Sequence, residues 1–259
     1  GHVETVRGVV LFPSGSALGG FGMSAALSGE VLLWSLAGQN LDPVAKCHIP
    51  APCRSLRLVL GVDAGLKPHI GNEARVLASA GKEVVELSIV AGEKKTHMQV
   101  LRSISVVPDS FVSGFDCFVD PYVWAQLPSG AYPKSLLAEE RVVLAGGSVE
   151  GGYLWVSRGG RCSHMQHTLK GGKNHMKETI SVELLDSKRM VAVNRRGLIF
   201  LAEWDKELAI TVRWARAGHR MYVSTIRRRE PLVLVSDGFD NSIQTIRITA
   251  PEDEDGQDE

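Results

Sequence analysis

Short apolar runs alternate with turn-forming residues along almost the whole chain. Runs rich in Val, Leu and Ile are bounded by Gly, Pro, Asn, Asp and Ser, and long stretches with a 3.6-residue period are nearly absent. No apolar run approaches the roughly 18 residues that a membrane-spanning helix needs. The pattern therefore predicts an all-β protein without a membrane span.

The order of these runs repeats. Residues 1–36 contain a Gly-His pair, an apolar strand, a turn, a small-residue strand, a Gly turn and an alternating strand that ends near Trp34. Residues 218–248 show the same order, with Gly-His, RMYVSTI, a charged turn RRRE, PLVLVSDGFDN and SIQTIRI. Self-similarity at roughly 40 residues indicates stacked supersecondary units.

Less regular copies lie between these two ends. Their expected strands are RLVLGV, ARVLASAG and KEVVELSIV, then FDCFVDPYVWAQL, RVVLAGGSVEG and GYLWVSR, then ISVELLD, KRMVAVNRRG and LIFLAEW. A fourth strand separates the units, in VAKCHIP, THMQVLRSI, CSHMQHTL and ELAITVRWA. The sequence thus predicts five units, at residues 1–50, 51–105, 106–170, 178–217 and 218–248.

The Gly-His to Trp order with four strands per unit resembles the WD40-repeat family, whose members are toroidal β-propellers, usually with seven blades. The resemblance spans residues 1–248 and implies four-stranded antiparallel blades that bury their faces against one another around a ring. In that family a His, a Ser or Thr, an Asp and a Trp connect the strands of a blade by hydrogen bonds. The positions that correspond to these structural residues are His2, Trp34, Trp155, His219 and Asp240.

Five blades do not complete such a ring. An open ring exposes an unpaired strand edge, which native proteins avoid. We therefore expect the full protein to have seven blades, with the missing blades or outer strand supplied by residues upstream of Gly1 or by a partner chain.

Charge is unevenly distributed along a chain whose formal net charge is zero. Residues 252–259, EDEDGQDE, carry six of the 29 acidic side chains and no basic one, so the rest of the chain has 29 basic against 23 acidic side chains, or +6. Such a segment cannot bury enough apolar surface to fold, so residues 249–259 are expected to form a disordered acidic tail. The tail is either solubilising, a docking strip for a basic partner, or a mask over the basic body.

The four scattered cysteines are most simply free thiols, which indicates an intracellular protein of the nucleus or cytoplasm. Cys162, His164 and His167, with His175 beyond, lack the second Cys pair of a zinc site. The Gly20-Phe-Gly22 segment fits a dinucleotide fingerprint but leads into a strand instead of a helix. We therefore expect no metal and no cofactor.

No arrangement indicates catalysis. The motif G-x-S-x-G is absent, and the serines lie in turns. Four aspartates could be read as carboxylate pairs, but turn capping is the simpler interpretation for each of them: Asp63, Asp109, Asp116 and Asp120. We therefore expect no catalytic residues.

The hypothesis that fits best is a non-catalytic scaffold or adaptor propeller that mediates protein–protein interactions within a multisubunit complex. A rigid ring fixes the turns on its narrow face, and their polar and basic side chains contact the partner. The candidate partner-binding residues are Lys82, Glu150, Arg195, Arg196, Arg220, Asp240 and Asn241.

The alternative is an RNA- or phosphate-binding propeller, because a +6 body attracts polyanions. In that case the phosphate contacts are Arg195, Arg196, Arg227, Arg228 and Arg229.

Overall fold

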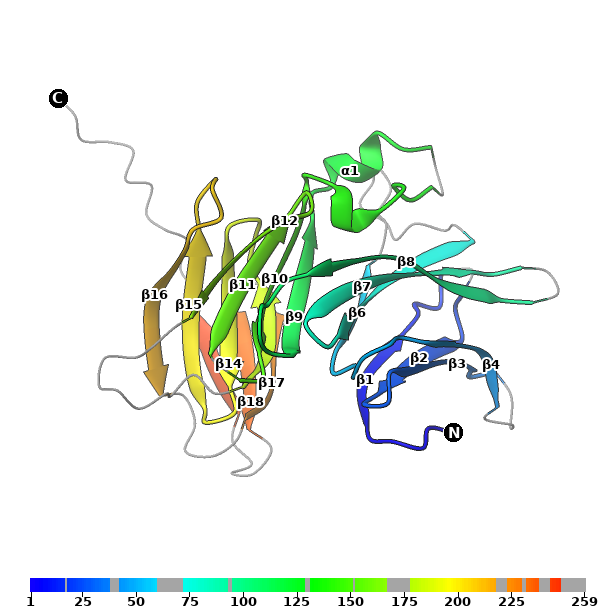
Figure 1. The fold of residues 1–259 in the computed structure, drawn as a ribbon, viewed down its shortest axis with the longest axis horizontal. Helices are drawn as coiled ribbons and strands as arrows, with labels where there is room; N and C mark the ends of the chain where they lie inside the picture. The colour runs from blue at the N-terminus through cyan, green and yellow to red at the C-terminus, as the bar shows by residue number, and fades with distance from the viewer. Residues whose placement is uncertain are drawn as a thin grey trace.

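Antiparallel strands form almost all of the secondary structure in the computed structural model (Figure 1). It describes residues 1–16, 18–37, 42–59, 72–92, 95–128, 131–150, 152–166, 178–217, 223–229, 232–237 and 243–247. The strands make four four-stranded sheets and one three-stranded sheet, and within each sheet every strand pairs with its neighbour in sequence. This is the strand order of a propeller blade, so the prediction of an all-β propeller of four-stranded antiparallel blades is confirmed.

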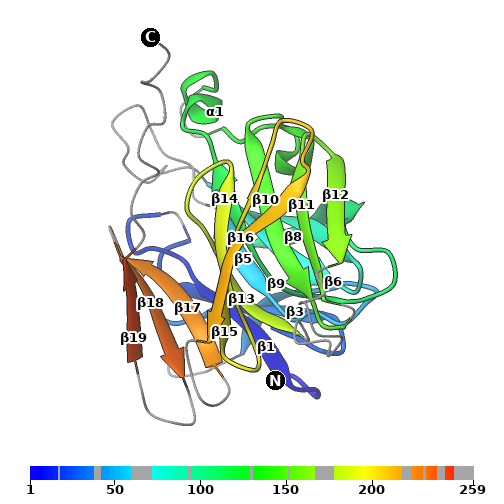
Figure 2. The same ribbon diagram turned by 90° about the vertical axis from the view of Figure 1, so that its left-hand side faces the viewer.

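The strands are bounded as follows. The first sheet contains β1 (Val6–Leu11), β2 (Phe21–Ala26), β3 (Glu30–Ser35) and β4 (Pro43–His48), and the second contains β5 (Leu56–Val59), β6 (Glu73–Ala80), β7 (Glu83–Val90) and β8 (His97–Ser105). The third contains β9 (Val112–Val119), β10 (Val142–Ser148), β11 (Tyr153–Arg158) and β12 (Arg161–Gln166), and the fourth contains β13 (Thr179–Leu184), β14 (Arg189–Asn194), β15 (Leu198–Trp204) and β16 (Ile210–Ala217). The fifth contains β17 (Val223–Arg229), β18 (Leu232–Asp237) and β19 (Ile243–Arg247), which lie side by side in Figure 2.

The first strands of successive sheets contact one another, from β1 to β5, β9, β13 and β17. They therefore form the inner edge around which the sheets are arranged. None of the helices in the described part of the chain combines the length and the apolar character needed to cross a bilayer.

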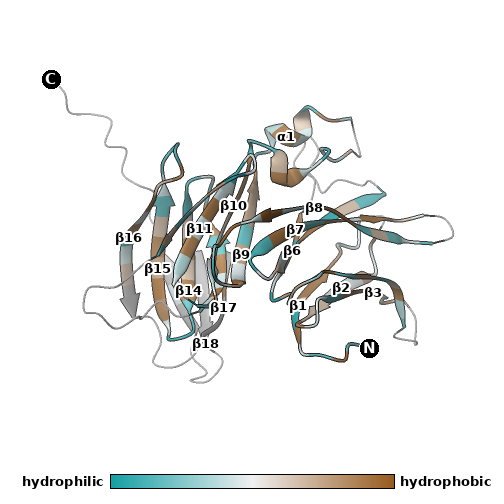
Figure 3. Ribbon diagram, viewed as in Figure 1, coloured by the Kyte–Doolittle hydropathy of each residue, from teal (hydrophilic) through white to brown (hydrophobic). Residues whose placement is uncertain are grey.

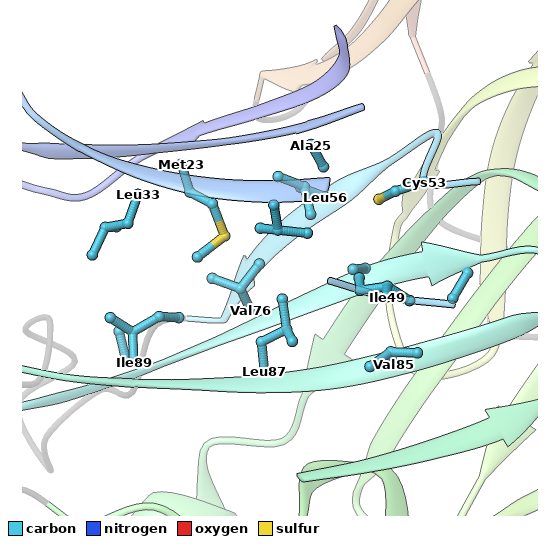
Figure 4. Packing of buried hydrophobic residues seen from close by; sticks show 14 of the residues in the cluster. Met23, Ala25, Leu33, Ile49, Cys53, Leu56, Val76, Val85, Leu87 and Ile89 are labelled. Carbon is cyan, nitrogen blue, oxygen red and sulfur yellow. The ribbon is translucent and has the colours of Figure 1, made fainter. Parts of the chain in front are cut away.

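One hydrophobic cluster lies between each pair of consecutive sheets. Figure 4 shows the first cluster, in which Met23 and Leu33 of the first sheet lie opposite Val76, Leu87 and Ile89 of the second. The other three clusters join Leu77 to Phe115 and Trp155, Val143 and Leu154 to Met190 and Phe200, and Val193 and Ile199 to Ile226. Stretches of β10 and β11 have hydrophobic colours in Figure 3, in agreement with the burial of these strands. Each sheet is thus stabilised by burying its faces against its neighbours.

The first sheet has one face that none of the other described sheets covers. On the side turned away from the second sheet, Val9 is 64% exposed, Leu11 65% and Leu36 49%. With Trp34 they line an apolar cavity of about 400 Å³. In the following sheets the corresponding face packs against the preceding sheet. We call the surface of Val9, Leu11, Trp34 and Leu36 the open face.

Two expected elements are wrong. The segment FDCFVDPYVWAQL is not one strand, because β9 ends at Val119 and Tyr122–Ala125 form helix α1. Pro121 suits a helix start, since it has no N–H to donate and its φ is fixed, and the carboxylate of Asp120 accepts the Tyr122 N–H at 2.9 Å. A short 3-10 helix, Leu136–Ala138, follows in the same connection.

The charged segment RRRE is not a turn either. Strand β17 continues to Arg229, whose partner in β18 is Leu232. Only two residues then connect the strands, which is the commonest length of a hairpin loop, so the ladder includes the three arginines.

The four cysteines are free thiols, as the sequence indicates. Cys53 lies in the first hydrophobic cluster and Cys47 packs against it. Burial raises the pKa of Cys53 to about 12 and that of Cys47 to about 11. Both thiols therefore stay protonated at neutral pH.

Candidate binding face

The turns between the second and third strands of the sheets lie at one end of the blades. Because consecutive strands are antiparallel, each of these turns is at the same end as the segment that enters the first strand. The turns place Lys82 between β6 and β7, Glu150 between β10 and β11, and Arg195 and Arg196 between β14 and β15, and all four residues are exposed. We call this end of the molecule the turn face.

Backbone hydrogen bonds join these turns from one blade to the next. The Val112 N–H donates to the Gly81 carbonyl at 2.7 Å, and the Val149 N–H donates to Phe111 at 2.8 Å. The Glu178 N–H then donates to Val149 at 2.9 Å, and the Arg195 N–H donates to Glu178 at 3.0 Å. These backbone hydrogen bonds therefore fix the positions of the described turns relative to one another, independently of the side chains that the turns carry.

A cavity of about 280 Å³ lies between the inner strands at the turn-face end. It is lined by Arg7, Gly8, Val9, Arg54, Ser55, Leu56, Arg57, Ser113, Glu178, Ile180 and Ser181, which come from β1, β5, β9, β13 and the segments that lead into them. Gly8 lets β1 approach β5 closely, because a Cβ at this position would lie 2.8 Å from Leu56 Cγ and 3.1 Å from its nitrogen. The lining is mostly polar, and three of its residues are arginines.

Ion pairs connect the cavity arginines across different sheets. Arg57 Nε lies 3.4 Å from Asp116 Oδ1, and Arg57 Nη2 donates to the Val182 carbonyl at 3.3 Å. Arg54 Nη1 lies 3.7 Å from Glu178 Oε1, while Arg195 donates to Glu178 Oε2 at 2.7 Å. These contacts join the second, third and fourth sheets around the cavity.

Positive charge is in excess here. Four arginines (Arg7, Arg54, Arg57 and Arg195) face two carboxylates (Asp116 and Glu178), which leaves +2. Arg7 is exposed and pairs with no acidic side chain among the residues that the structure describes.

Glu178 has an unusual backbone conformation. Its φ is 38°, in the left-handed region that non-glycine residues rarely adopt. Two backbone hydrogen bonds hold it there, from its own N–H to Val149 and from the Arg195 N–H to its carbonyl. The Glu178 carboxylate lies between Arg54 and Arg195. Strained backbone conformations of this kind are found most often at functional positions.

The structure brings only part of the sequence-predicted residues together. Lys82, Glu150, Arg195 and Arg196 share the turn face, whereas Arg227–Arg229 end β17 beside its connection to β18, at the opposite end of the blades. The five arginines of the RNA alternative therefore do not form one surface. Arg220, Asp240 and Asn241, with His219, lie outside the described residues.

Sequence reasoning missed the cavity residues. Asp116 is not a turn cap, because it lies within β9, accepts the Leu184 N–H at 2.8 Å and pairs with Arg57. Arg7, Arg54 and Arg57 lie in or just before the first strand of their unit. That shared position was the one available signal that they meet at the centre.

A side-chain hydrogen-bond network in the first blade connects the N-terminal segment to β2 and β3. His2 Nε2 lies 2.6 Å from Ser24 Oγ, which also accepts the Trp34 Nε1–H at 2.7 Å. His2 Nδ1 lies 3.0 Å from Glu30 Oε2, so a Glu at the start of β3 has the position for which the WD40 resemblance implies an Asp. Trp155 differs, because it is fully buried and its Nε1–H finds no hydrogen-bond partner among the residues that the structure describes.

Ser24→Ala is expected to lower the free energy of unfolding by about 1–3 kcal/mol, because it leaves Trp34 Nε1 and His2 Nε2 without their shared partner at a part-buried site. Urea unfolding followed by tryptophan fluorescence measures the change. Ser35→Ala is the matched control, since this half-buried serine of β3 makes no side-chain hydrogen bond among the described residues. Equal losses in the two variants would contradict a stabilising role for the network.

The described residues contain no group of three or more His, Cys, Asp or Glu arranged for a metal ion. Cys162 and His164 lie on β12, where His164 packs against Tyr153 with ring centroids 5.8 Å apart. Partial desolvation raises the pKa of the Cys162 thiol to about 12. His167 and His175 lie outside the described residues.

No protein-family model and no curated protein matches the chain. Among solved structures, the β-propeller domain of Cps50 (Swd1) from Myceliophteria thermophila is similar, with a TM-score of 0.53 and 11% sequence identity over 95% of this chain and 71% of that one. The computationally designed Ika8 protein has a TM-score of 0.48 and 12% identity over 96% of this chain and 72% of that one. At 11% identity, the likeness to the Cps50 domain shows the β-propeller fold alone.

Proposed function

We propose that the protein is a non-catalytic β-propeller scaffold that binds a protein partner on the turn face, within a multisubunit complex of the nucleus or cytoplasm. The observation that carries this proposal is the series of backbone hydrogen bonds that fixes charged turns around the arginine-lined cavity. Turns held in place before binding lose little conformational entropy when a partner docks. A rigid scaffold that presents its loops in this way is typical of binding proteins.

The proposed contacts are the turn residues. Lys82, Glu150, Arg195 and Arg196 supply exposed charges of both signs on the described part of this face. Arg220, Asp240 and Asn241 complete the proposed set. In the sequence, Arg220 precedes β17, the first strand of the fifth sheet, and Asp240 and Asn241 come between β18 and β19, its second and third strands.

Site-specific photo-crosslinking in cells tests the proposal. A photoreactive amino acid is placed at Lys82 or Glu150, and at Lys206 as the control, because Lys206 is exposed in the turn between β15 and β16 at the opposite end of the blades. We expect the same protein to be captured from Lys82 and Glu150 and not from Lys206. Capture from all three positions, or of nucleic acid in place of protein, would contradict the proposal.

We further propose that another four-stranded blade, supplied by residues upstream of Gly1, covers the open face. The packing between the later sheets supports this, since in each of them the face that corresponds to the open face packs against the preceding sheet. The chain also covers only 71% of the propeller domain to which it is similar. An open face that the upstream residues leave uncovered is the contrary outcome of the test given in the Discussion.

A further inference from the structure

We infer that the arginine-lined cavity binds the carboxylate side chains of an acidic segment of the protein partner. This inference rests on the proposed function and specifies the chemistry of the segment that the turn face recognises. The cavity of about 280 Å³ corresponds to about nine water molecules at about 30 Å³ each, so it can admit one or two side chains of a peptide.

The charge of the site favours an anion. Ion pairs hold three of the four arginines that give the excess of +2, namely Arg54, Arg57 and Arg195. A guanidinium group is planar and donates in a fork that matches the two oxygens of a carboxylate. Because the site is recessed between the inner strands, such a pair is screened less than one on the outer surface.

Hydrogen-bond donors of the cavity remain unused. Arg7 has no acidic partner in the described part of the chain, and Arg54 Nε is buried without a hydrogen-bond partner. The 3.7 Å between Arg54 Nη1 and Glu178 Oε1 is too long for a hydrogen bond. A buried donor without a partner is rare in native proteins, and a carboxylate from a ligand would satisfy it.

The lining argues for a peptide over a nucleic acid. Its eleven residues include no aromatic side chain on which a base could stack. A polynucleotide also needs a continuous basic surface, whereas Arg227–Arg229 lie at the other end of the blades. A short acidic segment needs only the local charge.

Fluorescence anisotropy with a labelled peptide of alternating Gly and Glu residues tests the inference, with the matching Gly and Gln peptide as the neutral probe. We expect the full chain to bind the acidic peptide at least tenfold more tightly, and added salt to weaken binding. Arg7→Gln should lower the affinity about tenfold, since it removes one charge-assisted hydrogen bond. Arg7 is exposed, so this variant keeps its fold, and Arg54→Gln probes the buried donor in the same way.

Arg161→Gln is the matched control, because this arginine is 64% exposed, lies at the start of β12 and is not part of the cavity. Equal binding of the two peptides, or Arg7→Gln and Arg54→Gln variants that bind like the wild type, would overturn the inference. The inference would also be overturned if a single-stranded RNA probe bound more tightly than the peptide and its binding depended on Arg7.

These outcomes are separate from those of the proposed function. Crosslinks from Lys82 and Glu150 that persist in Arg7→Gln would keep the turn face as a binding surface and remove only the acidic ligand. Peptide binding without any crosslinked partner would keep the acidic ligand of the cavity and remove the turn face as the surface that binds a protein partner.

Discussion

Glu86→Gln is expected to lower the free energy of unfolding by about 3 kcal/mol, because it removes the fully buried one of the two carboxylates that pair with Arg75. Glu86 is fully buried, Arg75 is 5% exposed, and Arg75 Nη1 donates to Glu86 Oε1 at 2.8 Å. Glu73 remains 2.8 Å from Arg75 Nε, so the loss lies at the lower end of the range for a broken buried pair.

Glu86 also anchors the connection between β9 and β10. Its carboxylate accepts the Ser135 hydroxyl at 2.7 Å and the Leu136 N–H at 3.1 Å, at the start of the 3-10 helix. The Tyr132 ring of the same connection lies over Arg75, with 5.4 Å from the guanidinium carbon to the ring centroid. The substitution therefore weakens both the ion pair and the attachment of this connection to the second sheet.

Urea unfolding of Glu86→Gln and Glu83→Gln measures the difference. Glu83 starts the same strand, β7, and its side chain has no hydrogen bond or ion pair among the described residues, so its substitution should cost less than about 0.5 kcal/mol. A Glu86→Gln protein within about 1 kcal/mol of the wild type would show that the buried pair adds little to stability.

The blades could be predicted from sequence because their second strands are buried on both faces. Strands β6 and β10 are almost fully buried, and they read in the sequence as continuous apolar or small-residue runs. The repeated order of such runs was enough to predict four-stranded sheets. The connection after β9 was not predicted, because PYVWAQL is too short for its period to separate helix from strand, and only Pro121 gave a signal.

The cavity could not be predicted in the same way. Arg57 meets Asp116, and Arg54 meets Glu178, and in each pair the two residues come from different sheets and are far apart in the sequence. Such pairs depend on how the blades pack, and no local pattern records that packing. Glu30 was missed for a different reason, since the WD40 resemblance implies an Asp in the turn, and the longer Glu side chain reaches His2 from the strand.

Leu33→Asp and Leu11→Asp are expected to have very different effects, although both leucines belong to the first sheet. Leu33 is fully buried against the second sheet, so an Asp there loses apolar contacts and buries an unpaired charge. We expect a loss of about 4 kcal/mol or more, which is enough to unfold many domains. Leu11 is 65% exposed on the open face, so Leu11→Asp should cost less than about 1 kcal/mol.

Thermal and urea unfolding of the two variants check this, and Leu11→Asp should also reduce the binding of a hydrophobic dye to the open face. A large loss for Leu11→Asp in the chain of residues 1–259 would show that the open face is already covered, and would remove the reason for another blade. In a polypeptide extended upstream of Gly1, the proposed blade would bury Leu11, and the same substitution should then cost as much as Leu33→Asp. If it stays tolerated in the extended chain, the residues upstream of Gly1 do not cover Val9, Leu11, Trp34 and Leu36, and the proposed upstream blade is wrong.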